Sequence, residues 1–262
     1  MSDAVRYQLH DAVGVITLDR PDNRNSMTPE LLDAFAAASA QARADAGARC
    51  VVVTGTGRCF SAGADFKSVL QRDDDARPRA AHERSYAMYE PFLSLLDLEV
   101  PVIAACNGHT IGGGFGLALV CDVRVGARDA RYGANFCRLG LAPGMAISYL
   151  LPRLVGVSRA SELLFTGRLI DGAEAERIGL LSAAVDADEV LPRAMELARA
   201  IAASAPLAVR MTKQVMYRGL DWDPRGHARV EAYAQAHTVG TADAAEGIAA
   251  LLAKREPRFT GT

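Results

Sequence analysis

The chain has 262 residues, half of them hydrophobic, and a formal net charge of −2 at pH 7. This length predicts one large domain, or one domain with a smaller appendage. The nearly neutral charge balance argues against a nucleic-acid partner, which would require a basic face. No apolar stretch approaches the roughly 20 residues that cross a bilayer, so we expect no membrane partner either.

The cysteines are five in number, and no two of them form a CxxC pair. An odd count without such pairs indicates neither a disulfide framework nor a zinc site, and we expect no bound metal. The first ten residues match neither a secretory signal nor an Arg-rich presequence. These features predict a reducing, aqueous compartment, most simply the cytoplasm.

In chain order, the first half alternates strand-like and helix-like segments. Residues 5–9 and 13–19 predict a pair of strands with a turn near Asp11. Thr28 and Pro29 are typical of the N-cap and first position of a helix, which we expect to end near residue 46. Strands that alternate with helices at this spacing predict an α/β core with largely parallel sheets. Later segments of this half predict a helix at 80–96 and strands at 50–54, 102–106 and 123–126.

The second half is helical in pattern from about residue 158, apart from a short strand expected at 181–185. We therefore divide the chain into an α/β core, residues 1–200, and a C-terminal helical subdomain, residues 201–262. Helices are predicted at 188–204, at 206–218 and at 223–254, the last with a break near Gly240.

Two segments are rich in small residues. Residues 59–67 (CFSAGADFK) and residues 107–116 (NGHTIGGGFG) each accompany a predicted strand, and we expect each to form a turn that leads into a helix. Small residues leave backbone N–H groups open to a ligand, and a helix N-terminus adds unpaired donors and a partial positive charge. A nucleotide loop is excluded, because no Lys-Ser/Thr follows the glycine triplet and no GxGxxG occurs. Two such turns favour a ligand site over tight packing alone.

With these segments the chain resembles the crotonase (enoyl-CoA hydratase/isomerase) family along nearly its whole length. The resemblance implies a superhelix of ββα turns with a C-terminal helical trimerisation subdomain. It also implies an acyl-CoA ligand, no cofactor beyond the coenzyme A thioester itself, and homotrimers that often pair into hexamers. The motifs that carry it are DRP at 19–21, NSM at 25–27, SAGAD at 61–65, NGHTIGGG at 107–114, CD at 121–122, LGLAPG at 139–144, FTG at 165–167 and KREPRF at 254–259.

The resemblance further implies an oxyanion hole formed by the backbone N–H groups of Ala64 and Gly113. Two fixed donors on a thioester oxygen stabilise it most when the carbonyl becomes an enolate. Loss of one such donor typically lowers the rate by about 10²–10³. We therefore expect these two amides to form the reaction centre.

Coenzyme A also needs contacts for its phosphates and its adenine. By family position, Arg24 and Lys67 of the same chain and Lys254 of a neighbouring subunit are the candidate cations. The alternative is that all three are ordinary solvated surface residues. The resemblance places the Ala62 backbone against the adenine and gives Asp65 the task of ordering the loop.

The two glutamates that the hydratases of this family use are absent. Gly116 stands at the first position and Phe136 at the second, and Asn135 replaces the proline that precedes the second. Glycine and phenylalanine can be neither acid nor base, so we do not expect the standard two-glutamate hydration. His82 and Tyr86, on the predicted helix at 80–96, are candidate acids, although the exposed face of an amphipathic helix carries such residues too.

Three functions therefore stay open. The first is an enzyme on enoyl-CoA or a related thioester that takes its acid or base from elsewhere. The second is a decarboxylase of a malonyl-type CoA, which forms the enolate by losing carbon dioxide and needs no general base. The third is a non-catalytic acyl-CoA carrier or sensor, which belongs to the class of binding modules.

Overall fold

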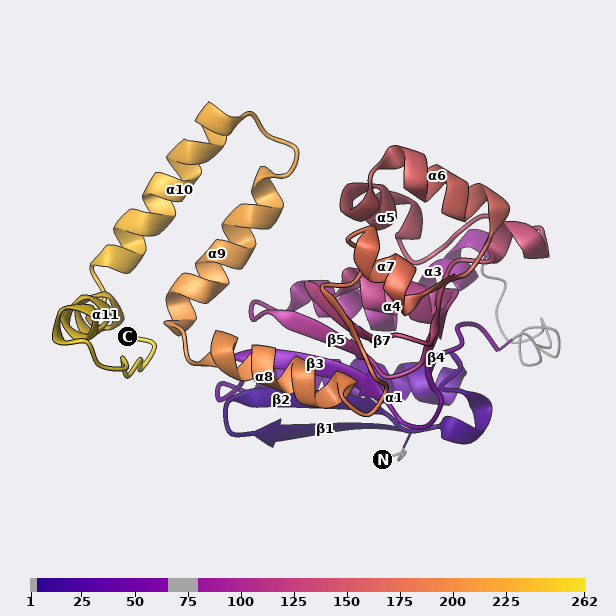
Figure 1. The fold of residues 1–262 in the computed structure, drawn as a ribbon, viewed down its shortest axis with the longest axis horizontal. Coiled ribbons are helices and arrows are strands. Elements are labelled where there is room, and N and C mark those ends of the chain that lie inside the picture. Colours follow the sequence, from indigo (N-terminus) through magenta and orange to yellow (C-terminus); the bar gives the residue numbers. More distant parts are fainter. Residues whose placement is uncertain (1–3, 66–79) are drawn as a thin grey trace.

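The computed structural model describes residues 4–65 and 80–262 (Figure 1). Within this part of the chain, a sheet in the order β1-β2-β3-β5-β7-β10 forms the centre. Only β1 and β2 pair antiparallel, and every other neighbour in this sheet is parallel. The α/β prediction with largely parallel strands is confirmed. The strands are β1 (Val5–His10), β2 (Val13–Leu18), β3 (Cys50–Gly55), β5 (Val102–Cys106), β7 (Val123–Ala127) and β10 (Ala183–Val185).

The central strands are buried on both faces, which explains why they read as continuous apolar runs. All five residues of β5 are buried, and so are the first five of β3. A parallel strand covered on both sides shows no alternation of polar and apolar residues. The β1–β2 turn occurs where expected, with Asp11 in the left-handed region at φ 56°.

A second sheet, in the order β4-β6-β8-β9, lies beside the first within the described residues. Two of its strands lie inside the segments rich in small residues, so these segments are more than simple turns, although the second leads into helix α4 as expected. Runs of three residues are too short to show a period, which is why the sequence did not predict them. The strands are β4 (Cys59–Ser61), β6 (His109–Ile111), β8 (Arg131–Gly133) and β9 (Ile170–Asp171).

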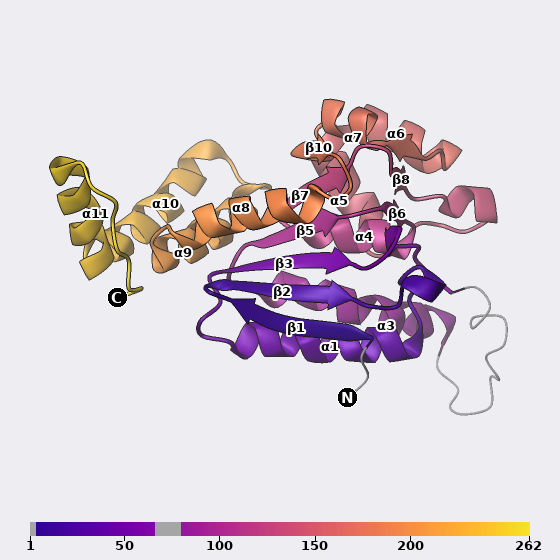
Figure 2. The ribbon, with the colours of Figure 1, turned by 60° about the horizontal axis from the view of Figure 1, so that its bottom comes forward.

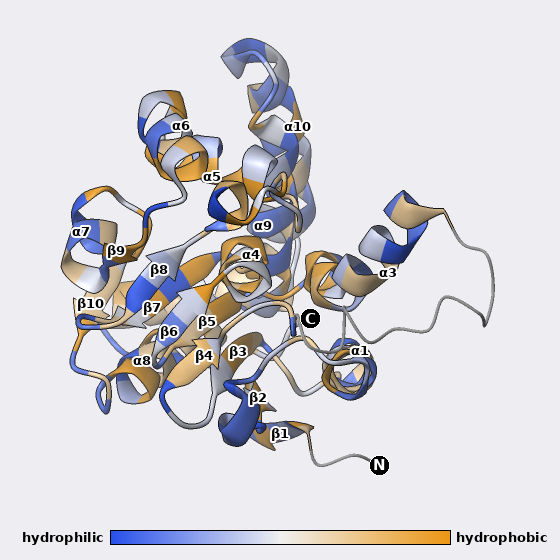
Figure 3. Ribbon diagram, turned by 90° about the vertical axis from the view of Figure 1, so that its right-hand side faces the viewer, coloured by the Kyte–Doolittle hydropathy of each residue, from blue (hydrophilic) through white to orange (hydrophobic). Residues whose placement is uncertain are grey.

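Helices cover both faces of the large sheet. In Figures 2 and 3, α1 and α8 lie on opposite faces of the strands, and the apolar strands lie between them. The Thr28 side chain accepts a hydrogen bond from Leu31 N (3.2 Å) and Pro29 opens α1, which confirms the predicted N-cap. The helices described between residues 29 and 202 are α1 (Pro29–Ala44), α3 (Ala81–Leu93), α4 (Gly113–Val120), α5 (Ile147–Val155), α6 (Val157–Thr166), α7 (Gly172–Arg177) and α8 (Val190–Ala202), and 3-10 turns lie at η1 (Pro21–Asn23), η3 (Ser94–Asp97) and η4 (Phe136–Leu139).

The last three helices extend away from the sheets (Figure 1). They are α9 (Pro206–Gly219), α10 (Pro224–Val239) and α11 (Ala242–Ala253), and the predicted break near Gly240 separates the last two. Their apolar side chains are largely exposed, and a groove of about 830 Å³ runs between α9 and α10. The use of residues 201–262 as an oligomerisation subdomain stays a prediction. The exposed apolar residues include Met216, Leu220, Trp222, Tyr233, Val239, Ile248, Leu251 and Leu252.

Candidate active site

The two segments rich in small residues meet at the start of α4. Gly63 has a positive φ of 81°, and a Cβ added there would lie 2.7 Å from Ile111 O and 2.8 Å from Gly113 N. Any larger residue at Gly63 would push the two backbones apart. Glycine is therefore required because the chain approaches itself here, as well as because of its φ.

Two backbone N–H groups beside this contact have no hydrogen-bond partner in the part of the chain that the structure describes. Gly113 is the first residue of α4, so its N–H is one of the donors that a helix leaves unpaired. Ala64 forms a parallel bridge with Met27, and the bridge engages the peptide groups on either side of Ala64. Met27 N donates to Gly63 O at 2.8 Å, while Ala64 N donates to no atom of residues 4–65 and 80–262.

The electrostatics at this point favour an anion. Helix α4 is buried along all eight of its residues. Its N-terminus carries the positive end of the helix dipole at Gly113. Partial charges act more strongly where water is excluded, so an oxygen that gains negative charge here would be stabilised.

A cavity of about 600 Å³ opens next to this contact and contains two of the predicted coenzyme A residues, Arg24 and Ala62. Ala62 N donates to Arg24 O at 3.0 Å, which joins the two loops. Arg58 is a second cation of the cavity that sequence reasoning missed, since the short turn after β3 carries no recognisable motif. The lining residues are Pro21, Asp22, Arg24, Gly57, Arg58, Cys59, Ala62, His109 and Ile111.

The two positions that lack glutamates are both apolar. A Cβ added at Gly116 would overlap the Met145 side chain, which is completely buried. Phe136 is half-buried, and its ring lies 4.0 Å from the place of a Cβ on Gly112. Asn135 Oδ1 lies 4.0 Å from the same Cβ position, so its carboxamide is a polar group near the start of α4. From the sequence, Asn135 was noted only as the replacement of a proline.

The candidate acids His82 and Tyr86 lie on α3. Both are exposed, Tyr86 by 59%, and they line an open depression of about 510 Å³ together with Glu90. A different residue of this helix, Tyr89, is half-buried, and its hydroxyl group packs against Gly144. The assignment of an acid on α3 stays a prediction.

The remaining predicted ligand contacts lie in different places. Lys254 is the C-cap of α11, at the opposite end of the molecule from β4 (Figures 1 and 2). Within one chain Lys254 is therefore not part of the cavity beside the Ala64 turn. Asp65 is half-buried and follows the bridge between Met27 and Ala64. Lys67 lies outside the described residues.

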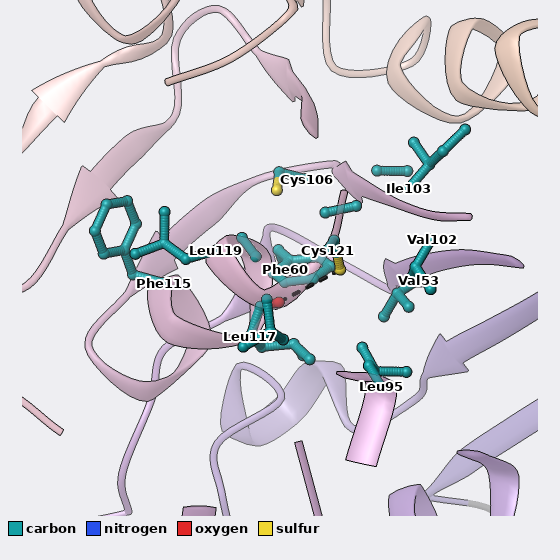
Figure 4. Packing of buried hydrophobic residues seen from close by; sticks show 14 of the residues in the cluster. Val53, Phe60, Leu95, Val102, Ile103, Cys106, Phe115, Leu117, Leu119 and Cys121 are labelled. Carbon is teal, nitrogen blue, oxygen red and sulfur yellow. Dashed lines mark hydrogen bonds between the residues drawn. The ribbon is translucent and has the colours of Figure 1, made fainter. Parts of the chain in front are cut away.

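Three buried thiols, those of Cys50, Cys106 and Cys121, belong to the core, whereas the buried Cys59 lines the cavity. Figure 4 shows Cys106 and Cys121 among packed apolar side chains. Burial raises the pKa of Cys50 and that of Cys106 to about 12, so both stay protonated at neutral pH. Cys137 is exposed. Among the described residues no three metal-ligating side chains gather in one place, and none of the helices is both long and apolar enough to cross a bilayer.

Comparisons with known proteins agree with this architecture. Residues 8–262 match the family model described as enoyl-CoA hydratase/isomerase. The Mycobacterium tuberculosis protein named "Probable enoyl-CoA hydratase EchA12" is 39% identical over 259 residues, which cover 95% of this chain and 89% of that protein. The enoyl-CoA hydratase structure from Bacillus anthracis is 32% identical with a TM-score of 0.91, and covers 99% of this chain and 100% of its own. The enoyl-CoA hydratase structure from Polaromonas sp. JS666 is 28% identical with a TM-score of 0.89, and the match covers 98% of this chain and 99% of that one.

The match runs through both segments rich in small residues and through the helices after residue 200, so it covers the site as well as the scaffold. The chain has the crotonase fold and belongs to the enoyl-CoA hydratase/isomerase family.

Proposed function

We propose that the chain binds an acyl-CoA thioester and holds its carbonyl oxygen between the N–H groups of Ala64 and Gly113. The observation that carries this proposal is the pair of unpaired amides beside the contact of Gly63 with α4. Preorganised backbone donors stabilise an enolate more than the neutral carbonyl, because charge develops on the oxygen. The helix dipole of α4 acts in the same direction.

The cavity that contains Arg24 and Arg58 would take the coenzyme A part of the ligand. It reaches Ala62, two residues before the proposed oxyanion turn, so the thioester and the nucleotide can be held at one time. Guanidinium groups suit phosphate, which they bind in a bidentate manner. Lys67 of this chain and Lys254 of a neighbouring copy are the further cations proposed, and no other cofactor or metal is required.

We propose further that the reaction is not the standard hydration. Water addition to a double bond needs a base for the water and an acid for the α-carbon. Gly116 and Phe136 supply neither, and Met145 fills the space beside Gly116. The first candidate function is therefore the conversion of an enoyl-CoA or related thioester through its enolate, with His82 or Tyr86 as the proton donor.

A malonyl-type decarboxylation is the second candidate, and the apolar character of Phe136 and Met145 favours it. Cleavage of the bond to the carboxylate releases carbon dioxide and leaves its electron pair on the α-carbon as the enolate, which then takes up one proton at that carbon. The reaction therefore needs no general base, only the oxyanion hole and a proton source. Fixed protein dipoles in place of water around the carboxylate favour this step. A carrier or sensor of acyl-CoA would use the same contacts without turnover.

The exposed apolar side chains of α9–α11 support association between copies of the chain, and membership of the family suggests a homotrimer, or a hexamer of paired trimers. An apolar surface of this kind on a soluble domain marks an association site. Such an assembly would also bring a neighbour's Lys254 toward the ligand. Localisation in the cytoplasm stays a prediction from the thiols.

A panel of thioesters tests the proposal with the purified full chain. Crotonyl-CoA, methylmalonyl-CoA, butyryl-CoA and free coenzyme A would be compared by thermal shift and by product mass. We expect acyl-CoA at a hundredfold excess over its Kd to stabilise the protein by about 2.7 kcal/mol relative to the ligand-free chain, and free coenzyme A at the same concentration to stabilise it less. Loss of carbon dioxide from methylmalonyl-CoA selects the second candidate, and stabilisation without any product selects the carrier. Hydration of crotonyl-CoA at the rates of family hydratases, or no stabilisation by any thioester, would contradict the proposal.

A further inference from the structure

Helix α4 presents Gly116 on the same face as Gly113, because residues three apart on a helix are neighbours. A Cβ at Gly116 would overlap the Met145 Cβ, lie 3.0 Å from the Met145 Cγ and lie 3.4 Å from the Ile147 Cγ1. Met145 and Ile147 are both fully buried. The overlapping Met145 atom is attached directly to the backbone, so no rotation of a side chain relieves the overlap.

Met145 is held in place by an unusual backbone. Its φ is 57° and that of Ala146 is 54°, both in the left-handed region that residues other than glycine rarely adopt. Such conformations persist only where the surroundings determine them. Ile147 N donates to Gly144 O at 3.1 Å, and the Tyr89 hydroxyl of α3 packs on Gly144. The turn is thus fixed between α3 and α5, and it directs Met145 onto α4.

We propose that Met145 is a specificity-determining residue that closes the face of α4 beside the Gly113 N–H. It excludes both a side chain at position 116 and a water molecule held by one. A thioester bound there meets hydrocarbon on this side, so addition of water across its double bond is prevented by packing as well as by the missing acids. This inference rests on the proposed function and deepens it.

The steric part is tested by thermal unfolding at one protein concentration. G116A should lower the apparent Tm by several degrees, because overpacking a buried contact forces a backbone shift. M145G should bring the Tm of G116A back to that of M145G alone. M145A should not, since it keeps the overlapping Cβ. The matched control is G247A on α11, where a Cβ would make an ordinary contact with Phe259 at 3.4 Å and should cause no loss.

Two outcomes overturn the steric part. One is a G116A protein as stable as wild type. The other is full rescue of G116A by M145A, which would show that the Met145 Cβ is not the obstacle. Neither outcome depends on any activity, so this part stands or falls without reference to the ligand.

The chemical part compares two proteins that both carry G116E and F136E, one with Met145 and one with M145G. Binding of butyryl-CoA is followed by thermal shift and hydration of crotonyl-CoA by product mass. We expect the protein with M145G to hydrate crotonyl-CoA about tenfold faster, or more, than the protein that keeps Met145. This gain is a fraction of the 10²–10⁴-fold acceleration that positioned acid–base groups supply. Equal hydration rates for the two proteins would overturn the role of Met145. So would the absence of hydration by an M145G protein that is folded and binds the thioester. If the wild-type chain binds no thioester, the proposed function fails, and the Tm comparison still decides the packing.

Discussion

One carboxylate, that of Asp122 in the residue before β7, links α9 to the core through several polar contacts. It accepts hydrogen bonds from Val102 N at 2.6 Å and from the Tyr217 hydroxyl at 2.7 Å, and it forms a 2.9 Å ion pair with Lys213. The side chains of Lys213 and Asp122 are only 14% and 12% exposed. Lys213 also donates to Val100 O at 2.9 Å. This cluster ties the C-terminal helices to the large sheet.

We predict that D122N destabilises the fold by about 3–5 kcal/mol, the usual cost of leaving one charge of a buried pair alone. The shape of the side chain is kept, so the loss reports the uncompensated Lys213 ammonium. This is a large share of the roughly 5–15 kcal/mol that stabilises a typical domain. A K213M substitution added to D122N should recover part of the loss, because it removes the buried unpaired charge.

Urea unfolding followed by circular dichroism at a fixed protein concentration measures this loss. The matched control is D221N, which breaks the exposed ion pair of Asp221 with Arg153 (3.1 Å, 64% and 37% exposed). Exposed pairs contribute about 0–1 kcal/mol, so the control should change little. A D122N protein no less stable than D221N would refute the reasoning, and so would a K213M addition that makes D122N worse.

Two further predictions concern titrating groups. At pH 8 a thiol reagent should label the exposed Cys137 of the native protein rapidly. Cys50 and Cys106 should react only on unfolding, because burial raises their pKa values to about 12. Rapid labelling of either buried thiol in the native protein would contradict the packing. Arg255 and the Arg258 N–H lower the pKa of Glu246 from 4.5 to about 2, so its contribution to stability is present above pH 4.5 and is lost as the pH falls toward 2. E246Q should reduce the acid sensitivity of the urea midpoint in that window only, and an unchanged pH profile would show that this exposed pair contributes nothing.

Features that depend on neighbouring residues could be predicted from the sequence. The N-cap of α1 at Thr28 and Pro29 is local chemistry, and the helix starts where the two residues indicate. The buried strands β3 and β5 are continuous β-branched or small apolar runs, and both were predicted almost to the residue. Strands β4 and β6 were missed because three residues carry no period, and their pairing is decided by segments far along the chain.

The candidate site shows the same division. The resemblance to the crotonase family led to the expectation that the turns at Ala64 and Gly113 form one site, whereas the contact of Gly63 with the start of α4 was not predicted. Met145 was not singled out, since it lies just beyond the LGLAPG motif and its contact with Gly116 depends on tertiary packing. Tyr89 was passed over for Tyr86 because helical pattern alone does not say which of two nearby tyrosines faces inward; Tyr89 is half-buried and Tyr86 is exposed.

The central claim concerns polarisation of a thioester carbonyl by two backbone amides, and infrared difference spectroscopy measures that polarisation directly. Butyryl-CoA with ¹³C at the carbonyl would be bound to the full chain and compared with the unlabelled ligand, so that only this one vibration remains. Donors at Ala64 and Gly113 predict a carbonyl stretch at lower frequency than in water, because hydrogen bonds to the oxygen weaken the double bond. A bound ligand whose carbonyl absorbs at or above its frequency in water would contradict the account.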